Sequence, residues 1–351
     1  MLACAARAPR ASPFSRGISV RFASGWLFEP ELRSDSGVIY KLDESSVHPQ
    51  RKRPPVYESS ADGQKYYVRV IAHKEDFENH LRLESMVSLS PHVRIATDTI
   101  QEHQALVYPS PGLLSLRRPR TTLPFSARRR ILRDALRGLA DLHDNGIVHD
   151  KLGPWAIFYE DTESPNQNGK IGISVNSVAL GPESWVTGPG PDSNEPHRSP
   201  EAWCRARRNQ ASDVFSFGTL IIYAMAANTA KRLPFDGDPT KSLLLKDRWH
   251  RALLRQISMC ADNEGFKGFL EHIGPDHPFQ KDLVQLYRAF DEDNSHQRAP
   301  IATDNSLTLQ PDAADLVAKM MNLDPARRIT AHEALGHGYF LSNEEDTSPP
   351  E

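Results

Sequence analysis

The sequence predicts an α+β fold in which a small β-rich lobe precedes a larger helical lobe. Three observations lead to this prediction. Residues 36–108 are dominated by short segments rich in β-branched and aromatic residues, whereas the chain beyond Pro124 carries long helical patterns. The chain has 351 residues, which is enough for two lobes of ordinary size. In such an arrangement a cleft between lobes is a common ligand site.

In the β-rich part, the three strand-like segments read GVIYKL, KYYVRVI and QALVYP. One helix is expected among them, from Lys74 to Leu89, because Pro91 in the following SPH cannot continue it. In the helical part, the first helix runs from Arg128 to Asn145, where Asn-Gly supplies a left-handed end. The segment SDVFSFGTLIIYAMA is apolar nearly all round and is expected to be a buried helix. Further helices are expected at Leu243–Cys260, Phe279–Phe290, Pro311–Met321 and Ala331–Leu335.

Composition excludes several classes of protein. The net charge of −3 disfavours a nucleic-acid binder. The longest apolar run, residues 218–227, is about half the roughly 20 residues that a membrane span needs. The cysteines Cys4, Cys204 and Cys260 are too scattered to indicate a zinc site or a disulfide framework.

Both ends of the chain differ from the middle. Residues 1–28 contain four arginines and no acidic residue, which is typical of a mitochondrial transit peptide, although a disordered N-terminus of a cytoplasmic protein has the same composition. Residues 343–351 are acidic and proline-rich and are expected to be disordered.

A series of motifs follows in order along the chain: IVHDKLGPWAI, KIGISVNSVALG, HRSPEAW, SDVFSFG and DPARRITAHEALGHGYF. This series resembles the protein kinase domain, and the resemblance covers residues 36–341. It implies a bilobal fold with an N-lobe at 36–108 and a C-lobe at 112–341. The long stretch at 228–304 resembles the insert of the cyclin-dependent and mitogen-activated kinases.

The motif IVHDKLGPWAI resembles the kinase catalytic loop, I-V-H-R-D-L-K-P-E-N-I. His149, Leu152, Pro154 and Ile157 match it without a gap. The chemical positions differ, and they are filled as follows: Asp150 stands at the arginine, Lys151 at the catalytic aspartate, Gly153 at the lysine and Ala156 at the metal-binding asparagine.

These replacements remove the groups that the resemblance assigns to phosphate transfer. A lysine is ordinarily protonated at neutral pH and cannot accept a proton, and a methyl group cannot hold Mg²⁺. The D-F-G motif is replaced by Val175–Ser177, in which Asn176 offers only a neutral amide. Shifting the alignment by one residue would make Asp150 the base, at the expense of the matches at Leu152, Pro154 and Ile157.

The nucleotide-binding positions of the first lobe are also altered. Arg69 stands where the family has its phosphate-binding lysine, and its usual glutamate partner is Glu84 or Glu78, although a gap-free count reaches Leu81. Between Gly37 and Gly63 there is no other glycine, so a phosphate-cradling loop is missing. Tyr108 resembles the gatekeeper, which places Pro111 where a backbone N–H normally meets adenine.

Architectural positions are kept. SPE resembles the A-P-E motif, whose Glu201 is expected to pair with Arg328, and Asp213 resembles the aspartate that caps amides of the catalytic loop. This pattern is typical of a pseudokinase, with another protein as the expected partner, ATP binding left open and no Mg²⁺ expected. Two alternatives remain: an atypical serine/threonine kinase that uses Asp150, and a purely structural scaffold.

Overall fold

The computed structural model describes residues 20–21, 27–28, 31–43, 56–109, 113–116, 123–160, 169–174, 177–181, 184–187, 197–225, 253, 255–292, 301 and 309–341. It divides into two compact units. The first comprises residues 1–72 and 96–110, and the second comprises residues 73–95 and 111–351. The proposed transit segment at 1–28 lies almost entirely outside the described residues, and the acidic tail at 343–351 lies wholly outside them.

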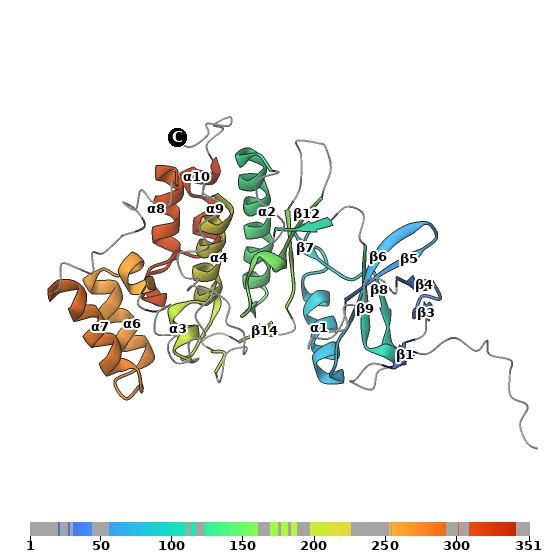
Figure 1. The fold of residues 1–351 in the computed structure, drawn as a ribbon, viewed down its shortest axis with the longest axis horizontal. Helices are drawn as coiled ribbons and strands as arrows, with labels where there is room; N and C mark the ends of the chain where they lie inside the picture. Colours follow the sequence, from blue (N-terminus) through green and yellow to red (C-terminus); the bar gives the residue numbers. More distant parts are fainter. Residues whose placement is uncertain are drawn as a thin grey trace, which may run out of the picture. The chain divides into compact units, whose positions relative to one another are not determined.

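The first unit is built on an antiparallel sheet in the order β3-β4-β5-β6-β9-β8 (Figure 1). The strands are β3 Glu31–Arg33, β4 Ile39–Leu42, β5 Val56–Ala61, β6 Gln64–Val70, β8 Asp98–Ile100 and β9 Ala105–Pro109, and β1 Val20–Arg21 pairs with β2 Leu27–Phe28. Asp62 and Gly63 both have positive φ and close the β5–β6 hairpin, as Asp-Gly turns favour. The inner face packs tyrosines and valines together, including Tyr40, Tyr57 and Val68.

The second unit begins with α1 Lys74–Met86 and β7 Val93–Arg94. The helix ends three residues before the predicted end at Leu89, because the Val87 amide turns back to the Glu84 carbonyl at 3.2 Å. Strand β7 joins a sheet in the order β10-β12-β13-β7, with β10 Leu113–Ser115, β12 Ile157–Glu160 and β13 Gly169–Gly172.

Helices form most of the second unit. They are α2 Phe125–Asp144, α3 Pro200–Trp203, α4 Gln210–Met225, α6 Asn263–Ile273, α7 Gln280–Glu292, α8 Pro311–Met320, α9 Ala331–Leu335 and α10 Gly338–Leu341. Helix α2 begins at Phe125 rather than Arg128, since the Arg128 amide already donates to the Pro124 carbonyl at 3.0 Å. The predicted helix at Leu243–Cys260 lies largely outside the described residues, which show helix at 255–260.

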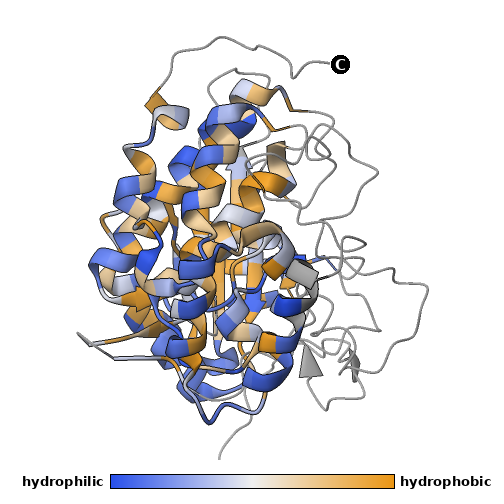
Figure 2. Ribbon diagram, turned by 90° about the vertical axis from the view of Figure 1, so that its left-hand side faces the viewer, coloured by the Kyte–Doolittle hydropathy of each residue, from blue (hydrophilic) through white to orange (hydrophobic). Residues whose placement is uncertain are grey.

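The core of this unit lies around α4. Its side chains are buried almost continuously from Ser212 to Met225 and pack with apolar residues of α2, α8 and α9. The helices that face the viewer in Figure 2 alternate between hydrophobic and hydrophilic residues, as helices with one covered face do. None of the helices in the described part of the chain combines the length and apolar character that a membrane crossing requires.

Candidate functional site

The loop that resembles the kinase catalytic loop follows β11 Ile147–Val148 and continues into a 3₁₀ turn at Pro154–Ala156. Asp213, near the start of α4, holds this loop. Its carboxylate accepts from the amides of His149 at 2.8 Å and Asp150 at 3.0 Å, and it lies 3.2 Å from Nε2 of His143. Asp213 therefore caps loop amides, which is the contact expected of it.

His149 supports the loop from within. Its Nδ1 accepts from the Lys151 amide at 3.3 Å, so the ring is a neutral tautomer whose Nε2 donates to the Gly172 carbonyl at 2.9 Å. The Ser177 hydroxyl donates to the His149 carbonyl at 3.2 Å. His149 is 1% exposed, and its contacts are those of a residue that fixes backbone.

Asp150 is the carboxylate on which the alternative kinase mechanism depends, and it is bound to Arg208. The Nε and Nη2 atoms of Arg208 donate to its two oxygens at 2.7 and 3.2 Å. Both side chains are buried, at 8% and 1% exposure. Burial raises the pKa of the Asp150 carboxyl, and the hydrogen bond and charge of Arg208 oppose that shift. Asp150 also has φ of 54°, in the left-handed region that aspartate tolerates better than most residues.

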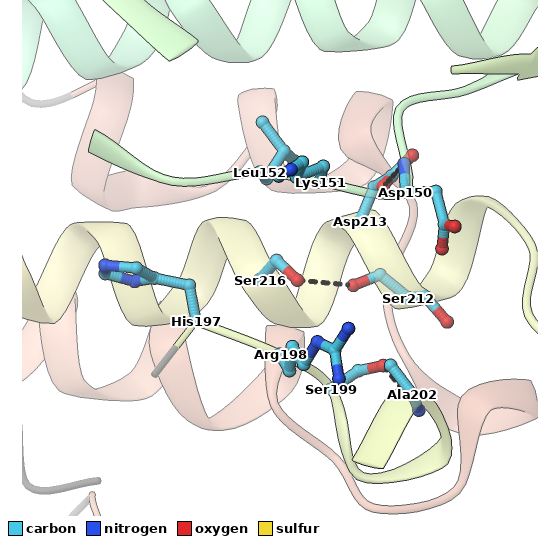
Figure 3. A pocket seen from close by; sticks show the side chains of 10 residues that line it. All are labelled: Asp150, Lys151, Leu152, His197, Arg198, Ser199, Ala202, Ser212, Asp213 and Ser216. Carbon is cyan, nitrogen blue, oxygen red and sulfur yellow. Dashed lines mark hydrogen bonds between the residues drawn. The ribbon is translucent and has the colours of Figure 1, made fainter. Parts of the chain in front are cut away.

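Lys151, at the position of the catalytic base, is half-buried and lines a small pocket that is partly open to solvent. Figure 3 shows this pocket between the loop, α4 and the segment around α3. Ten residues line it: Asp150, Lys151, Leu152, His197, Arg198, Ser199, Ala202, Ser212, Asp213 and Ser216. Its serine hydroxyls have internal partners; that of Ser216 bonds to the Ser212 carbonyl at 3.0 Å.

Trp155 fills the space next to Gly153. A Cβ atom added at residue 153 would lie under 3.0 Å from three carbons of the Trp155 ring. Gly153 itself has φ of −168°, which any residue adopts, so the indole ring, and not backbone strain, excludes a larger side chain there. The ring of Trp155 lies edge-to-face with His197 at 6.0 Å, and His197 in turn meets Tyr223 at 5.8 Å.

The metal-binding positions offer no clear ligands in the described residues. Ala156 is 6% exposed, and its methyl group packs in the core. Val175 and Asn176 lie outside the described residues. Ser177 is 1% exposed, and its hydroxyl accepts from the Ser174 amide at 3.1 Å while it donates to His149. The donors present do not fit a Mg²⁺ ion, which prefers several oxygen ligands.

The nucleotide-binding candidates belong to different units. Arg69 on β6 is half-buried, and Tyr108 on β9 is 5% exposed and pairs across the sheet with Tyr67. Glu84 on α1 is 4% exposed, and its Oε1 lies 3.2 Å from Nε2 of His80. The pairing of Arg69 with Glu84 stays a prediction.

Two further positions complete these assignments. Glu78 forms an exposed pair with Lys74 at 3.5 Å. Pro111, at the predicted adenine position, lies outside the described residues.

The ion pair expected between Glu201 and Arg328 is present. Arg328 donates to both oxygens at 2.5 and 2.8 Å, and the Ser212 hydroxyl adds a third bond at 2.5 Å. Its remaining donors meet backbone carbonyls, including that of Asn322 at 2.6 Å. Burial opposes the ionisation of Glu201, but the charge and hydrogen bonds of Arg328 outweigh it and lower the pKa of the carboxyl to about 2.

Comparison with known proteins assigns the family. The profile of the protein kinase domain matches residues 68–340. The chain belongs to the protein kinase family. Curated relatives are the mitogen-activated protein kinases HOG1 of Eremothecium gossypii, 27% identical over 218 residues, and HOG1 of Candida glabrata, 46% identical over 216 residues. Each alignment covers 61% of this chain and 41% of the relative.

Mitogen-activated protein kinase 14 of Xenopus laevis is 25% identical over 217 residues, which are 61% of this chain and 51% of that protein. The chain therefore spans between two-fifths and about half of the length of these relatives. The sheet of the first unit and the helices of the second are consistent with the bilobal α+β kinase fold.

Two residues of this kinase-like site were not singled out from the sequence. Arg208 bonds to Asp150 of the loop. His197 lies edge-to-face with Trp155, which stands at the glutamate position of the loop motif. A signal did exist for Arg208: an acidic residue at a position normally held by arginine requires a new cation, and RARR follows SPE closely. No comparable signal identified the partner of Trp155.

Proposed function

We propose that this protein is a pseudokinase, a kinase-fold module that acts by binding another protein and does not transfer phosphate. The observation that carries the proposal is the Asp150–Arg208 pair. Asp150 directly precedes the position of the catalytic base in the chain, and both of its oxygens accept from a buried guanidinium. These two bonds hold the carboxylate buried, at 8% exposure, and oriented toward the guanidinium rather than toward a substrate hydroxyl.

The groups around Asp150 support the same conclusion. Phosphate transfer depends on positioning and on charge stabilisation, most of it from a base and metal ions. Here a cationic side chain stands at the base position, a buried methyl at one metal position, and the indole of Trp155 against the position of the loop lysine. Because the groups at the base, metal and loop-lysine positions are all replaced, restoring one of them would not restore the rate of phosphate transfer.

The alternative of an atypical serine/threonine kinase rests on two observations. The curated relatives are named as protein kinases, and burial raises the pKa of Asp150, which is the direction a general base requires. Against this alternative, none of the residues at the metal-binding positions carries a carboxylate. A third reading, a scaffold with no nucleotide in the cleft, makes the same prediction for activity.

Two measurements separate these readings. The first is incorporation of radiolabelled phosphate from ATP into the protein itself and into generic protein substrates. We expect background incorporation, and incorporation that Asp150→Asn abolishes would overturn the proposal. The second is a thermal-shift titration with ATP. A shift that requires Mg²⁺ supports the enzyme, a shift without Mg²⁺ supports a nucleotide-binding pseudokinase, and no shift supports the scaffold.

A further inference from the structure

A basic and aromatic surface lies on the second unit, and none of its residues lines the pocket beside Lys151. It consists of Trp185, Arg205, Arg207 and His272, and is named the Trp185 surface below. Residues 205–208 alternate between exposed and buried, so that Arg205 and Arg207 point outward while Arg208 reaches inward to Asp150.

The Trp185 surface is held rigidly by three separate segments. Val186 and Arg208 exchange two backbone hydrogen bonds, at 2.7 and 2.9 Å. The guanidinium of Arg207 lies 4.6 Å from the centre of the Trp185 ring, and His272 on α6 meets the same ring edge-to-face at 5.4 Å. Nε2 of His272 also lies 2.9 Å from the Arg207 carbonyl. The indole is therefore presented in one orientation, half-buried.

The positive charge of this surface is not neutralised within the described part of the chain. Arg205 and Arg207 are both exposed, and no ion pair joins either of them to a carboxylate among those residues. Glu271, next to His272 on α6, is exposed and pairs with neither arginine. By contrast, Arg208 is matched by Asp150. An exposed guanidinium, that of Arg207, therefore lies against the Trp185 ring, and the exposed Arg205 stands two residues before it in the chain.

The backbone at Arg205 provides a second, independent observation. Arg205 has φ of 56° and follows the end of α3, a position at which glycine is strongly favoured. An arginine there carries a cost of about 1 kcal/mol that glycine would not. Strained residues of this kind gather at functional sites, and here the strain places a guanidinium at the surface.

From these observations we infer that the Trp185 surface binds an acidic peptide segment of a partner protein. Arginine and tryptophan are the residues that most often dominate binding energy at protein interfaces. The guanidinium fork pairs with carboxylates, and the indole accepts an apolar side chain from the same peptide. A nucleic acid would also meet a cation and an aromatic ring, but the net charge of −3 disfavours it.

This inference names the partner chemistry for the binding role proposed above, and rests on that role. The test measures peptide binding and not phosphate transfer, so a negative result for the Trp185 surface leaves the pseudokinase proposal to be judged by its own assay. The full chain is titrated into a short fluorescein-labelled peptide of alternating glutamate and phenylalanine, and fluorescence anisotropy reports binding. A peptide with glutamine in place of glutamate and a labelled oligouridylate of equal length are titrated in parallel.

We expect saturable binding of the acidic peptide that weakens with salt, and much weaker binding of the glutamine peptide. Arg207→Glu and Trp185→Ala should each lower the affinity at least about tenfold. The matched control is Arg288→Glu on α7, an exposed arginine outside the surface, which should leave the affinity unchanged. Absence of saturable binding, equal binding by Arg207→Glu, or tighter binding of the oligouridylate would each overturn the inference.

Discussion

Replacing Asp150 with asparagine tests whether this residue is structural or catalytic. Asparagine keeps the shape of the side chain and tolerates the left-handed backbone at φ of 54°, so the change removes mainly the charge. Arg208, 1% exposed, then loses its counter-ion, and the amide nitrogen of asparagine faces one of its donors. Arg208 keeps its hydrogen bond from Nη1 to the backbone carbonyl of Ala206, at 3.1 Å.

The expected cost follows from this geometry. Removing one partner of a buried ion pair costs about 3–5 kcal/mol, because the other charge stays buried. Asparagine retains one carbonyl oxygen that accepts from Arg208, so the lower end, about 3 kcal/mol, is expected. For a chain of this size that corresponds to a fall in Tm on the order of 5 °C or more.

Urea unfolding followed by circular dichroism measures this cost, and the chain provides a matched control. Asp144 also pairs with a basic side chain, the imidazole of His332, at 2.9 Å, but both side chains are more than half exposed. Asp144→Asn should therefore change the free energy of unfolding by about 1 kcal/mol at most. If Asp150→Asn were as stable as Asp144→Asn, the structural role of Asp150 would be refuted.

Three further results are expected. Arg328→Ala should lower the free energy of unfolding by about 3–5 kcal/mol, seen as a lower urea midpoint, because the carboxylate of Glu201 is left buried; an unchanged midpoint would contradict this. Since the folded pKa of Glu201 is about 2 against an ordinary 4.5, its ionisation stabilises the fold above pH 4.5, and about 3 kcal/mol should be lost as the pH falls from 4.5 towards 2; Glu201→Gln should flatten that part of the acid-unfolding curve. Gly153→Ala should destabilise the protein by about 1–3 kcal/mol through overlap with the Trp155 ring, and adding Trp155→Ala should recover much of that loss in thermal unfolding; strictly additive effects would show that the two residues are not in contact.

The elements predicted best are those whose apolar pattern is strong. The buried helix α4 and strands β6 and β9 lie within a residue or two of the expected ranges. Strand β5, which reads VYESSA, was not predicted, because two of the three side chains on its inward face are the small residues Ser59 and Ala61. A strand that buries serine and alanine gives little hydrophobic alternation to detect.

At the site, the sequence indicated which groups are replaced but not what the replacements do. The contact of Asp213 with loop amides and the Glu201–Arg328 pair follow from motif positions. The partner of Asp150 lies 58 residues away, outside any motif, so only the fold could bring the two together. The change from arginine to aspartate at position 150 indicates that the residue has a new, cationic partner, but the sequence does not identify Arg208 as that partner.

The structure also shows how the loop after β11 is held in its shape. Two of its residues are fixed by contacts that need no substrate: His149 by the Gly172 carbonyl and Asp150 by Arg208. Arg208 belongs to the same short segment that presents Arg207 beside Trp185. Loss of the Asp150–Arg208 pair should therefore loosen the Trp185 surface as well as the loop. In the anisotropy titration, Asp150→Asn should lower the affinity of the protein for the acidic peptide, although Asp150 does not belong to that surface. An unchanged affinity in a folded Asp150→Asn protein would show that the loop and the surface are independent.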